Sequence, residues 1–351
     1  MPKNLCYLLF ILLTSFFGCK NSEPGSNSAG QNYKHQIVIY CLDSFRKSGL
    51  ESTIVPEFSR LNNCAVKLQM FPNVKELCQA VKDRSNYGKY DLALGIDNSF
   101  ALSESVAVHF VPPDDFSSEQ LSKECIFDSS LRLVPYGYSS LCLVYNKQIL
   151  PSAPQSFGEL QDARYLNQMA ICDPHYSGVG RATLFWSLAL FGPDGYEHLW
   201  KSLRKNIYKC YPEADEALEA LKRGECSLLL SLNTIPAYLQ ELDPMNTDFA
   251  ASMLKEGSYQ YIESIAVHRG SRNSALASKF VRYLLSPEAQ KMVIYKLGMF
   301  PANRKTLLPT HFTTLPFTSY SVNNRLNMTL IAEQLNLWLD FWDRLFGFQI
   351  A

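Results

Sequence analysis

The chain has 351 residues, 19% of them charged, and its 33 basic and 33 acidic residues give a formal net charge of +0 at pH 7. Nucleic-acid-binding proteins carry a basic surplus that this sequence lacks, so no nucleic-acid partner is expected. The length exceeds what one hydrophobic core usually serves and suffices for two lobes, which imply a cleft between them.

The first residues predict an export signal. A single lysine precedes the apolar run 5–13, which is too short to span a bilayer comfortably, and Cys19 directly follows Gly18. Because this arrangement resembles a bacterial lipobox, we expect residues 1–18 to be a signal peptide and Cys19 to carry lipid. An ordinary signal peptide with an incidental cysteine is the alternative. The segment 19–35 is rich in Ser, Asn and Gly and is expected to be a flexible tether outside the cytoplasm.

The other cysteines do not form a recognisable motif. Ten cysteines include Cys6 and Cys19, which leaves eight in the body of the chain. No C-x-x-C spacing occurs and no histidine stands at zinc-ligand spacing from a cysteine pair, so no metal site is expected. Buried free thiols and disulfides both remain open.

The first part of the chain alternates between strands and helices. Alternation of this kind is typical of a parallel sheet covered by helices on both faces, so the fold class is α/β. Within it, the hydrophobic strand is expected to stop at Gly95, with Asp97 and Asn98 just beyond its end. The predicted elements are strands at 36–42, 64–71 and 90–97 and helices at 52–63 and 73–86.

A long extended segment, 131–150, leads into a second alternating unit. Pro135 and Gly137 inside it mark a turn or a crossing between lobes. The elements predicted after it are helices at 154–161, 180–192, 196–206 and 215–225, a strand at 168–173, a strand leading into a helix over 226–242, an extended segment at 261–270 and two helices over 273–303 that separate at Ser286-Pro287.

The final helix-period stretch has an apolar face, which is formed by Ile331, Leu335, Trp338, Trp342 and Leu345. Packing against a lobe is the preferred interpretation, and a membrane-surface helix, which would need flanking basic residues, is the alternative. Crossings near 134–145 and 261–270 divide the chain into two lobes. Lobe 1 is expected to comprise 36–133 and 264–318, and lobe 2 to comprise 134–263 and 319–351.

Polar residues follow four of the predicted strands. They are Asp43 and Ser44, Asp97 and Asn98, Asp173 followed by Ser177 and Gly178, and Asn233 and Thr234. Because ligands of open α/β sheets bind outside the carboxyl ends of the strands, these residues are expected to converge on one crevice. Taken singly, each is also an ordinary helix cap or turn residue.

The kind of ligand follows from these side chains. Carboxylates at Asp43, Asp97 and Asp173, together with abundant tyrosine, favour a cationic or hydrogen-bond-rich organic ligand. The turn "YSGVG" before a helix suits a phosphate, although it is equally compatible with a plain tight turn. Walker A, H-E-x-x-H, G-x-S-x-G and a strand followed by G-x-G-x-x-G are all missing from the sequence.

From Gln36 almost to the C-terminus, the sequence resembles the thiamine-binding lipoprotein or periplasmic component of ABC-type importers, a family of type II periplasmic binding proteins. The matching pieces, in the family's order and spacing, are "YCLDSF", "DLALGIDNS", "VPYGYSSLCLVYNK", "CDPHYSGVG", "KRGECSLLLSLNTIPAY", "FVRYLLSPEAQ" and "GMFPAN". The resemblance implies two α/β lobes joined by hinge crossover strands. It also implies a monomer without a cofactor that captures thiamine or its phosphates for a membrane permease and a separate ATPase.

The resemblance carries over to individual positions. Asp97 and Asn98 match the family's acidic and amide pair at the pocket, Ser177 and Gly178 match a polar pair before a helix, and Asn233 and Thr234 fall in a binding stretch. Aromatic residues of the family are replaced at Leu42, Ala214, Leu232 and Gly298. The rings expected to take their place are those of Tyr136, Tyr176, Tyr211 and Phe300.

Two other functions stay open. A thiamine-degrading transferase on the same two-lobe fold uses a cysteine nucleophile, for which Cys41, Cys142 and Cys172 are the candidates, although no activating base is evident near them in the sequence. An importer component for another organic cation, a phosphate ester or ferric ion is the other alternative.

Overall fold

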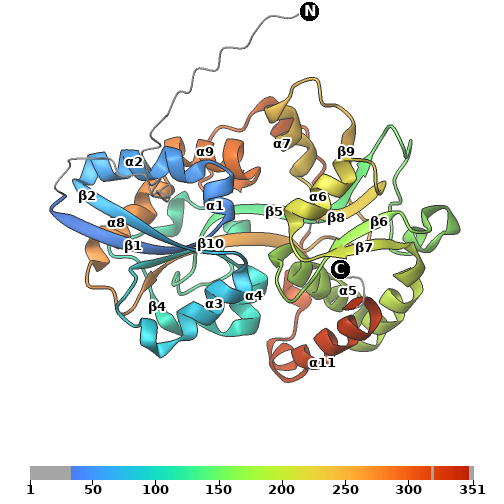
Figure 1. Ribbon diagram of the computed structural model, residues 1–351, viewed down its shortest axis with the longest axis horizontal. Helices are drawn as coiled ribbons and strands as arrows, with labels where there is room; N and C mark the ends of the chain where they lie inside the picture. The colour runs from blue at the N-terminus through green and yellow to red at the C-terminus, as the bar shows by residue number, and fades with distance from the viewer. Residues whose placement is uncertain (1–32, 318–319, 348–351) are drawn as a thin grey trace, which may run out of the picture. The chain divides into compact units, whose positions relative to one another are not determined.

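The computed structural model describes residues 33–317 and 320–347 (Figure 1). The predicted signal peptide, Cys19 and nearly all of the predicted tether lie outside the described residues. The strands are β1 (His35–Leu42), β2 (Cys64–Phe71), β3 (Leu92–Asp97), β4 (Phe110–Val111), β5 (Val134–Asn146), β6 (Met169–Cys172), β7 (Ile207–Tyr211), β8 (Leu228–Leu232), β9 (Phe249–Ser252), β10 (Gln260–His268) and β11 (Phe300–Pro301).

The helices cover the sheet in the way that the sequence period predicts. They are α1 (Ser44–Lys47), α2 (Leu50–Asn62), α3 (Val74–Lys82), α4 (Asn98–Glu104), α5 (Gly178–Leu203), α6 (Ala214–Lys222), α7 (Ile235–Leu242), α8 (Ser274–Leu284), α9 (Pro287–Leu297), α10 (Thr310–Thr313) and α11 (Met328–Phe346). Helix α3, for example, buries Val74, Leu77, Cys78 and Val81 along one face. Its first turn is capped by the side chain of Asn73, which accepts a hydrogen bond from the Glu76 N–H at 3.0 Å.

One strand links the two halves of the fold. The main strand order is β2-β1-β3-β10-β5-β8-β6-β7. The first half of β5 pairs with β10 and β11, and its second half pairs with β8 and β9. Strands β5 and β10 accordingly run through the middle of the described fold in Figure 1. The predicted α/β, two-lobe architecture with hinge crossover strands is confirmed, whereas the residue ranges given for the lobes remain a prediction.

Two bulges face each other across β10. Strand β3 ends at Asp97, as the predicted range 90–97 has it, and the expected stop at Gly95 is wrong. Gly95 is instead skipped in the pairing of Leu94 and Ile96 with β10. A φ of 99° at Gly95 suits this extra residue, because L-residues with side chains avoid it. On the other side, Tyr136 is skipped in the pairing of β5 with β10. Pro135 and Gly137 therefore produce a bulge within a continuous strand rather than a turn.

Other local predictions differ from the structure at few places. The helix predicted at 154–161 is wrong, since that segment has one short 3₁₀ turn, Glu159–Gln161. Its turn is held by side chains: the Glu159 N–H donates to Ser156 Oγ at 3.0 Å, and Glu159 Oε2 accepts from the Gln155 N–H at 3.0 Å. Strands β4, β7, β9 and β11 and helices α4 and α10 were not predicted. The predicted break after 192 is confirmed by the non-helical backbone of Gly192 inside α5.

Helix α11 packs on the second half of the fold. The rings of Trp342 and Trp200 lie edge to face with centroids 4.8 Å apart, and the Tyr196 hydroxyl donates to the Trp338 carbonyl at 3.1 Å. The packing predicted for this helix is confirmed. Within 33–317 and 320–347, no helix is both long enough and apolar enough to cross a membrane.

Candidate functional site

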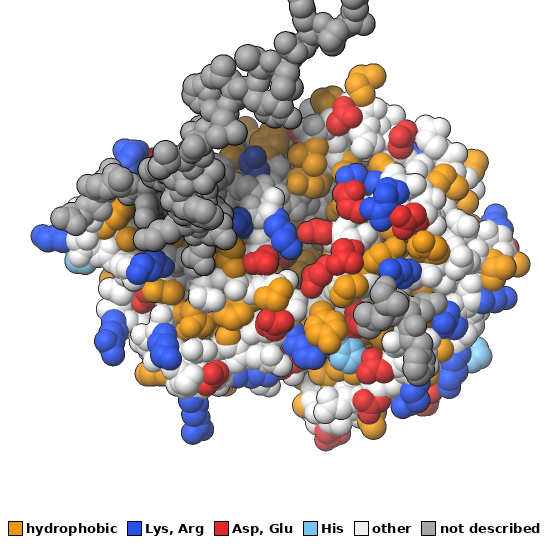
Figure 2. Space-filling view, in the orientation of Figure 1, with side chains coloured by type: hydrophobic (Ala, Val, Ile, Leu, Met, Phe, Trp, Pro, Cys, Tyr) orange, Lys and Arg blue, Asp and Glu red, His pale blue; other side chains and the backbone are white. Residues whose placement is uncertain are grey.

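A cavity of about 370 Å³ opens where the ends of several elements meet, among them β1, β8, β10 and the first turns of α1, α5 and α6. Parallel strands and the helices after them bring such ends to the same edge of a sheet. The face seen in Figure 2 carries acidic and basic side chains over its middle. We refer to the cavity of about 370 Å³ as the cleft cavity.

Four of the predicted site residues line the cleft cavity: Ser44, Tyr176, Ser177 and Gly178. Ser44 is exposed at the start of α1. Ser177 caps α5, since its Oγ accepts a hydrogen bond from the Gly180 N–H at 3.3 Å. Tyr176 is 37% exposed, and Lys75 Nζ lies 4.8 Å from the centre of its ring. The polar loop before α5 is thus part of the cavity wall.

Asp97 lies directly behind this wall and is fully buried. A Cβ atom at Gly178 would stand 2.6 Å from Asp97 Oδ2 and 2.7 Å from the Tyr261 hydroxyl, so glycine is required for this close approach. Asp97 Oδ1 accepts from the N–H groups of Ser99 and Phe100 at 2.9 and 3.2 Å, whereas Oδ2 has no hydrogen-bond partner among the described residues. Burial raises the pKa of the Asp97 carboxyl.

Three predicted residues instead hold hinge segments together. The Asn98 amide donates to the Gln260 carbonyl at 2.9 Å and accepts from the Ile262 N–H at 3.1 Å, which fixes β10. The Asn233 side chain accepts from the Ser140 N–H at 2.9 Å. Thr234 Oγ1 lies 3.0 Å from the Ser139 hydroxyl oxygen. Their side chains lie outside the lining of the cleft cavity, and any contact with a ligand remains a prediction for them.

Four further predicted site residues do not line the cleft cavity: Asp43, Asp173, Tyr211 and Phe300. Asp43 precedes α1 without a side-chain capping bond. Asp173 Oδ1 accepts from the backbone N–H of His175 at 2.8 Å and pairs with the His175 ring at the same distance. Tyr211 is buried under Lys209, and Phe300 packs on the ring of Tyr138. Of these four residues, only Asp173 holds the loop before α5 through its side chain.

Glu263 is one of several lining residues that were not predicted from the sequence. It lies on β10, its Oε2 accepts from the Tyr136 hydroxyl, and its Oε1 accepts from the Tyr261 hydroxyl at 3.1 Å. Burial raises the pKa of Glu263 to about 7, although the tyrosine hydrogen bonds oppose the shift. A glutamate inside the otherwise apolar "YIESIAVH" was the available signal, because charged residues are rarely buried without a purpose.

A second acidic group lies at the start of α6, where Glu213, Asp215 and Glu216 line the cavity. Burial, reinforced by Asp215, raises the pKa of Glu213 to about 7, and Lys47 opposes the shift. Throughout the described part of the chain, no basic side chain forms an ion pair with these acids or with Glu263. The four acids that line the cavity therefore outnumber its two lining lysines, Lys47 and Lys296.

Three tyrosines line the cavity although family aromatics are replaced. Of the rings proposed as substitutes, Tyr176 lines the cavity. Tyr136 does not line it, but its hydroxyl donates a hydrogen bond to the lining residue Glu263. Tyr238 and Tyr261 were missed. Tyr238 fills the space beside Gly298, where a Cβ atom would stand 2.6 Å from the tyrosine ring. Of the four positions at which a family aromatic residue is replaced, those of Leu42, Ala214 and Leu232 line the cavity.

The cysteine candidates for a nucleophile are poorly placed for that role. The eight body cysteines are buried and unpaired. Burial raises the pKa of both Cys41 and Cys172 to about 12 and raises that of Cys142 as well. A cysteine nucleophile reacts as the thiolate, which these environments disfavour. Among the described residues, no group of three or more His, Cys, Asp or Glu side chains is placed to hold a metal ion.

Comparison with known proteins identifies the family. The model for bacterial extracellular solute-binding proteins matches residues 76–316. The thiamine-binding periplasmic protein of Haemophilus influenzae is 27% identical over 322 residues, which cover 90% of this chain and 94% of that protein. The protein of the same name from Brucella melitensis is 26% identical over 337 residues, covering 95% and 98%.

Solved structures agree with this assignment. A periplasmic thiamin binding protein has a TM-score of 0.79 at 26% identity and covers 92% of this chain and 99% of its own. A fructose-6-phosphate-bound periplasmic binding protein from Actinobacillus pleuropneumoniae, at 16% identity and a TM-score of 0.73, shares the fold and covers 91% of this chain and 100% of its own. The chain belongs to the bacterial extracellular solute-binding proteins.

Proposed function

We propose that this protein captures thiamine or a thiamine phosphate outside the cytoplasm and delivers it to an ABC permease served by a separate ATPase. The relatives named for thiamine cover almost the whole chain at 26–27% identity. The two-lobe fold supplies the cleft that such capture needs. In this proposal the protein is a monomeric binding protein without catalytic turnover or cofactor.

The observation that carries the proposal is the uncompensated charge of the cleft cavity. Four carboxylates line it, those of Glu213, Asp215, Glu216 and Glu263, against the two ammonium groups of Lys47 and Lys296. Thiamine is an organic cation with two flat rings. Carboxylates stabilise its charge, and tyrosine faces attract both the cation and the rings.

The acidic side chains in and behind the cavity wall favour thiamine, a cation, over thiamine diphosphate, which carries negative charge. The loop at Ser177 and Gly178 supplies first-turn N–H groups of α5 that suit a phosphate. However, the buried Asp97 carboxyl lies against this turn and, when ionised, repels an anion. Thiamine is therefore expected to bind more tightly than the diphosphate.

Isothermal titration of protein lacking residues 1–20 tests the proposal. Thiamine should bind saturably with one site per chain, more tightly than thiamine monophosphate and diphosphate, and should be recovered unchanged after incubation with the protein. Choline, a cation without rings, serves as the control and should bind much more weakly. No heat with thiamine or with either phosphate would refute the vitamin assignment, while equal binding of choline would refute the role of the rings.

Cys19 is the proposed site of a lipid anchor. We infer that the chain is cleaved after Gly18 and that the new N-terminal cysteine carries lipid, which holds the protein on the outer side of a membrane. The segment 19–35 then separates the binding unit from the bilayer.

A further inference from the structure

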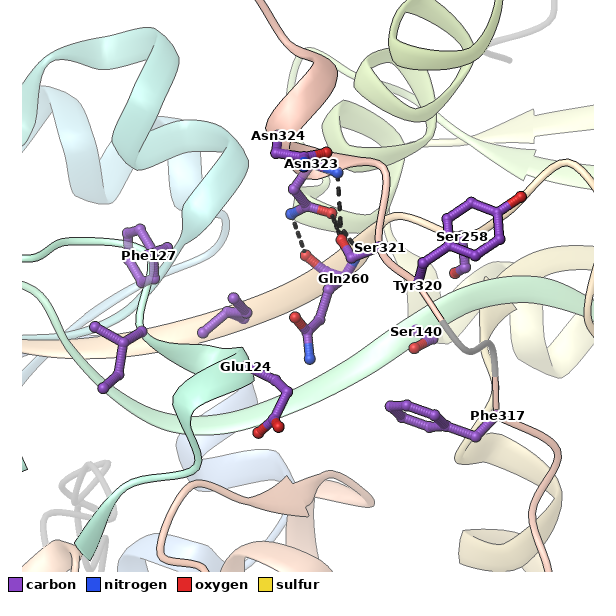
Figure 3. Close-up of a pocket in the computed structure, with 12 residues that line it drawn as sticks. Glu124, Phe127, Ser140, Ser258, Gln260, Phe317, Tyr320, Ser321, Asn323 and Asn324 are labelled. Carbon is purple, nitrogen blue, oxygen red and sulfur yellow. Dashed lines mark hydrogen bonds between the residues drawn. The ribbon is translucent and has the colours of Figure 1, made fainter. Parts of the chain in front are cut away.

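Successive residues of β10 face two different cavities. Side chains alternate between the faces of a strand. Tyr261 and Glu263 line the cleft cavity, whereas Gln260 and Ile262 line a second cavity of about 330 Å³ on the other face of β10 (Figure 3). We call this second space the back cavity. Its volume lies within the range of small-molecule sites.

Gln260 presents a free amide to the back cavity. Its backbone is fixed, because its N–H donates to Asn323 Oδ1 at 2.8 Å and its carbonyl accepts from the amides of Asn98 and Asn323, each at 2.9 Å. The side chain is 7% exposed, and its amide has no hydrogen-bond partner within the described residues. The amide is not among the fully buried polar atoms without a partner, so it is solvated in the free protein, and a ligand that pairs with it replaces that water.

Two further polar groups accompany this amide. The Ser140 side chain is 4% exposed, and its hydroxyl has no hydrogen-bond partner in the part of the chain that the structure describes. Glu124 is exposed, and its carboxylate forms no ion pair with a described residue. Figure 3 shows the Gln260 amide running into the space between Glu124 and Ser140. Three unengaged groups thus converge on one place.

The walls around these groups are flat and apolar. Ile262, Phe127 and Phe317 line the back cavity; Figure 3 shows Phe317 on the side of Ser140 and Phe127 at the opposite end. A glutamine amide offers an acceptor and a donor in one plane, which pair with the complementary acceptor and donor of another amide. Aromatic faces on the walls favour a planar partner.

We propose that the back cavity is a second ligand site, which binds a small planar molecule that carries an amide-like edge. The edge pairs with Gln260, Ser140 receives a further hydrogen bond, and the ring lies against Phe317. The site uses none of the residues that line the cleft cavity, so it stands whether or not the cleft binds thiamine.

Benzamide is the probe for this site, because it combines a planar ring with an amide. Ligand-detected NMR titrations should show saturable binding, and a crystal soaked with benzamide should place it against Gln260. The Gln260→Leu variant should weaken binding about tenfold or more. Acetophenone keeps the ring and carbonyl but lacks the N–H donors, and it should bind several-fold more weakly than benzamide.

Matched variants make the result decisive. Gln79→Leu makes the same change at an exposed position of α3 away from both cavities and should leave benzamide binding unchanged. Ser140→Ala removes one hydroxyl, should weaken binding a few-fold, and provides the test if Gln260→Leu does not fold. The proposal is overturned if the soaked crystal shows only water there, if benzamide occupies the cleft cavity instead, or if Gln260→Leu and Ser140→Ala both bind it as tightly as the unaltered protein.

Discussion

The environment of Glu263 is unfavourable for an ionised carboxyl, but its position on the wall of the cleft cavity is favourable for binding a cation. Its carboxyl faces the cleft cavity, accepts two tyrosine hydroxyls and has no basic partner among the described residues. Burial raises its pKa to about 7, so the free protein holds this group largely protonated at pH 6 and largely ionised at pH 8. A cationic ligand stabilises the ionised form and thereby lowers the pKa.

We expect thiamine affinity to rise between pH 6 and pH 8 and Glu263→Gln to remove much of this rise. At pH 8 the variant should bind about tenfold or more weakly, because a hydrogen bond to a charged group contributes roughly 1.5–3 kcal/mol. Calorimetric titration at each pH measures both effects. Glu219→Gln, on α6 but off the lining, should behave as the unaltered protein, and equal losses in the two variants would contradict the role of Glu263.

The same carboxyl affects the stability of the ligand-free protein in the opposite sense. Its folded pKa lies above the usual value of 4.5, so the folded state binds more protons than the unfolded state between pH 4.5 and about 7. The stability contributed by the protonated group is lost as the pH rises through this window. Ligand affinity at pH 8 is therefore obtained at the expense of stability in the empty protein.

At the scale of elements, α11 fixes the second half of the fold through its tryptophans. Trp342 is 1% exposed, whereas Leu337 on the same helix is 62% exposed. Trp342→Ala should lower the free energy of unfolding by about 3–5 kcal/mol, because it empties space against Trp200. Leu337→Ala should change it by less than about 0.5 kcal/mol. Denaturant unfolding measures both, and equal effects would show that α11 is not part of the core.

The sequence predicts most elements because strands and helices have their own local periods. The apolar runs at β1, β2 and β3 and the stripe on α3 are visible without any partner. The bulges at Gly95 and Tyr136 are not, since each exists relative to the residues of β10 that it faces. They depend on strand pairing between segments far apart in the chain.

The candidate site is predicted less well than the fold for the same reason. Ser177 and Gly178 were found because a polar turn before a helix is a local pattern. Asn98 and Asn233 have the right residue type at strand ends, but their amides are engaged by β10 and β5. Tyr238 reaches the cleft cavity only through the tertiary fold, so no local pattern marks it. Glu263 is conspicuous as an acid within an apolar strand, but its position on the cavity wall also depends on the tertiary fold.

At the scale of the whole molecule, the proposed anchor at Cys19 makes a testable claim about location. The full-length protein expressed in a bacterium should incorporate radioactive palmitate and sediment with membranes. Cys19→Ala should abolish labelling and, if the chain is still cleaved, release the protein into the soluble extracytoplasmic fraction. Cys6→Ala is the matched control and should leave labelling intact, whereas labelled Cys19→Ala would contradict the assignment.

The central position of β10 also governs how this chain folds. Strand β10 lies between β3 and β5 and pairs with both, although about 170 residues of chain separate its Ile265 from its partner Leu94. Contacts between such distant segments form slowly, because a long loop must close first. The polypeptide must therefore be available as far as His268 before its central sheet can assemble. Slow assembly leaves an exported chain a longer interval in which it is still unfolded enough to be threaded across a membrane.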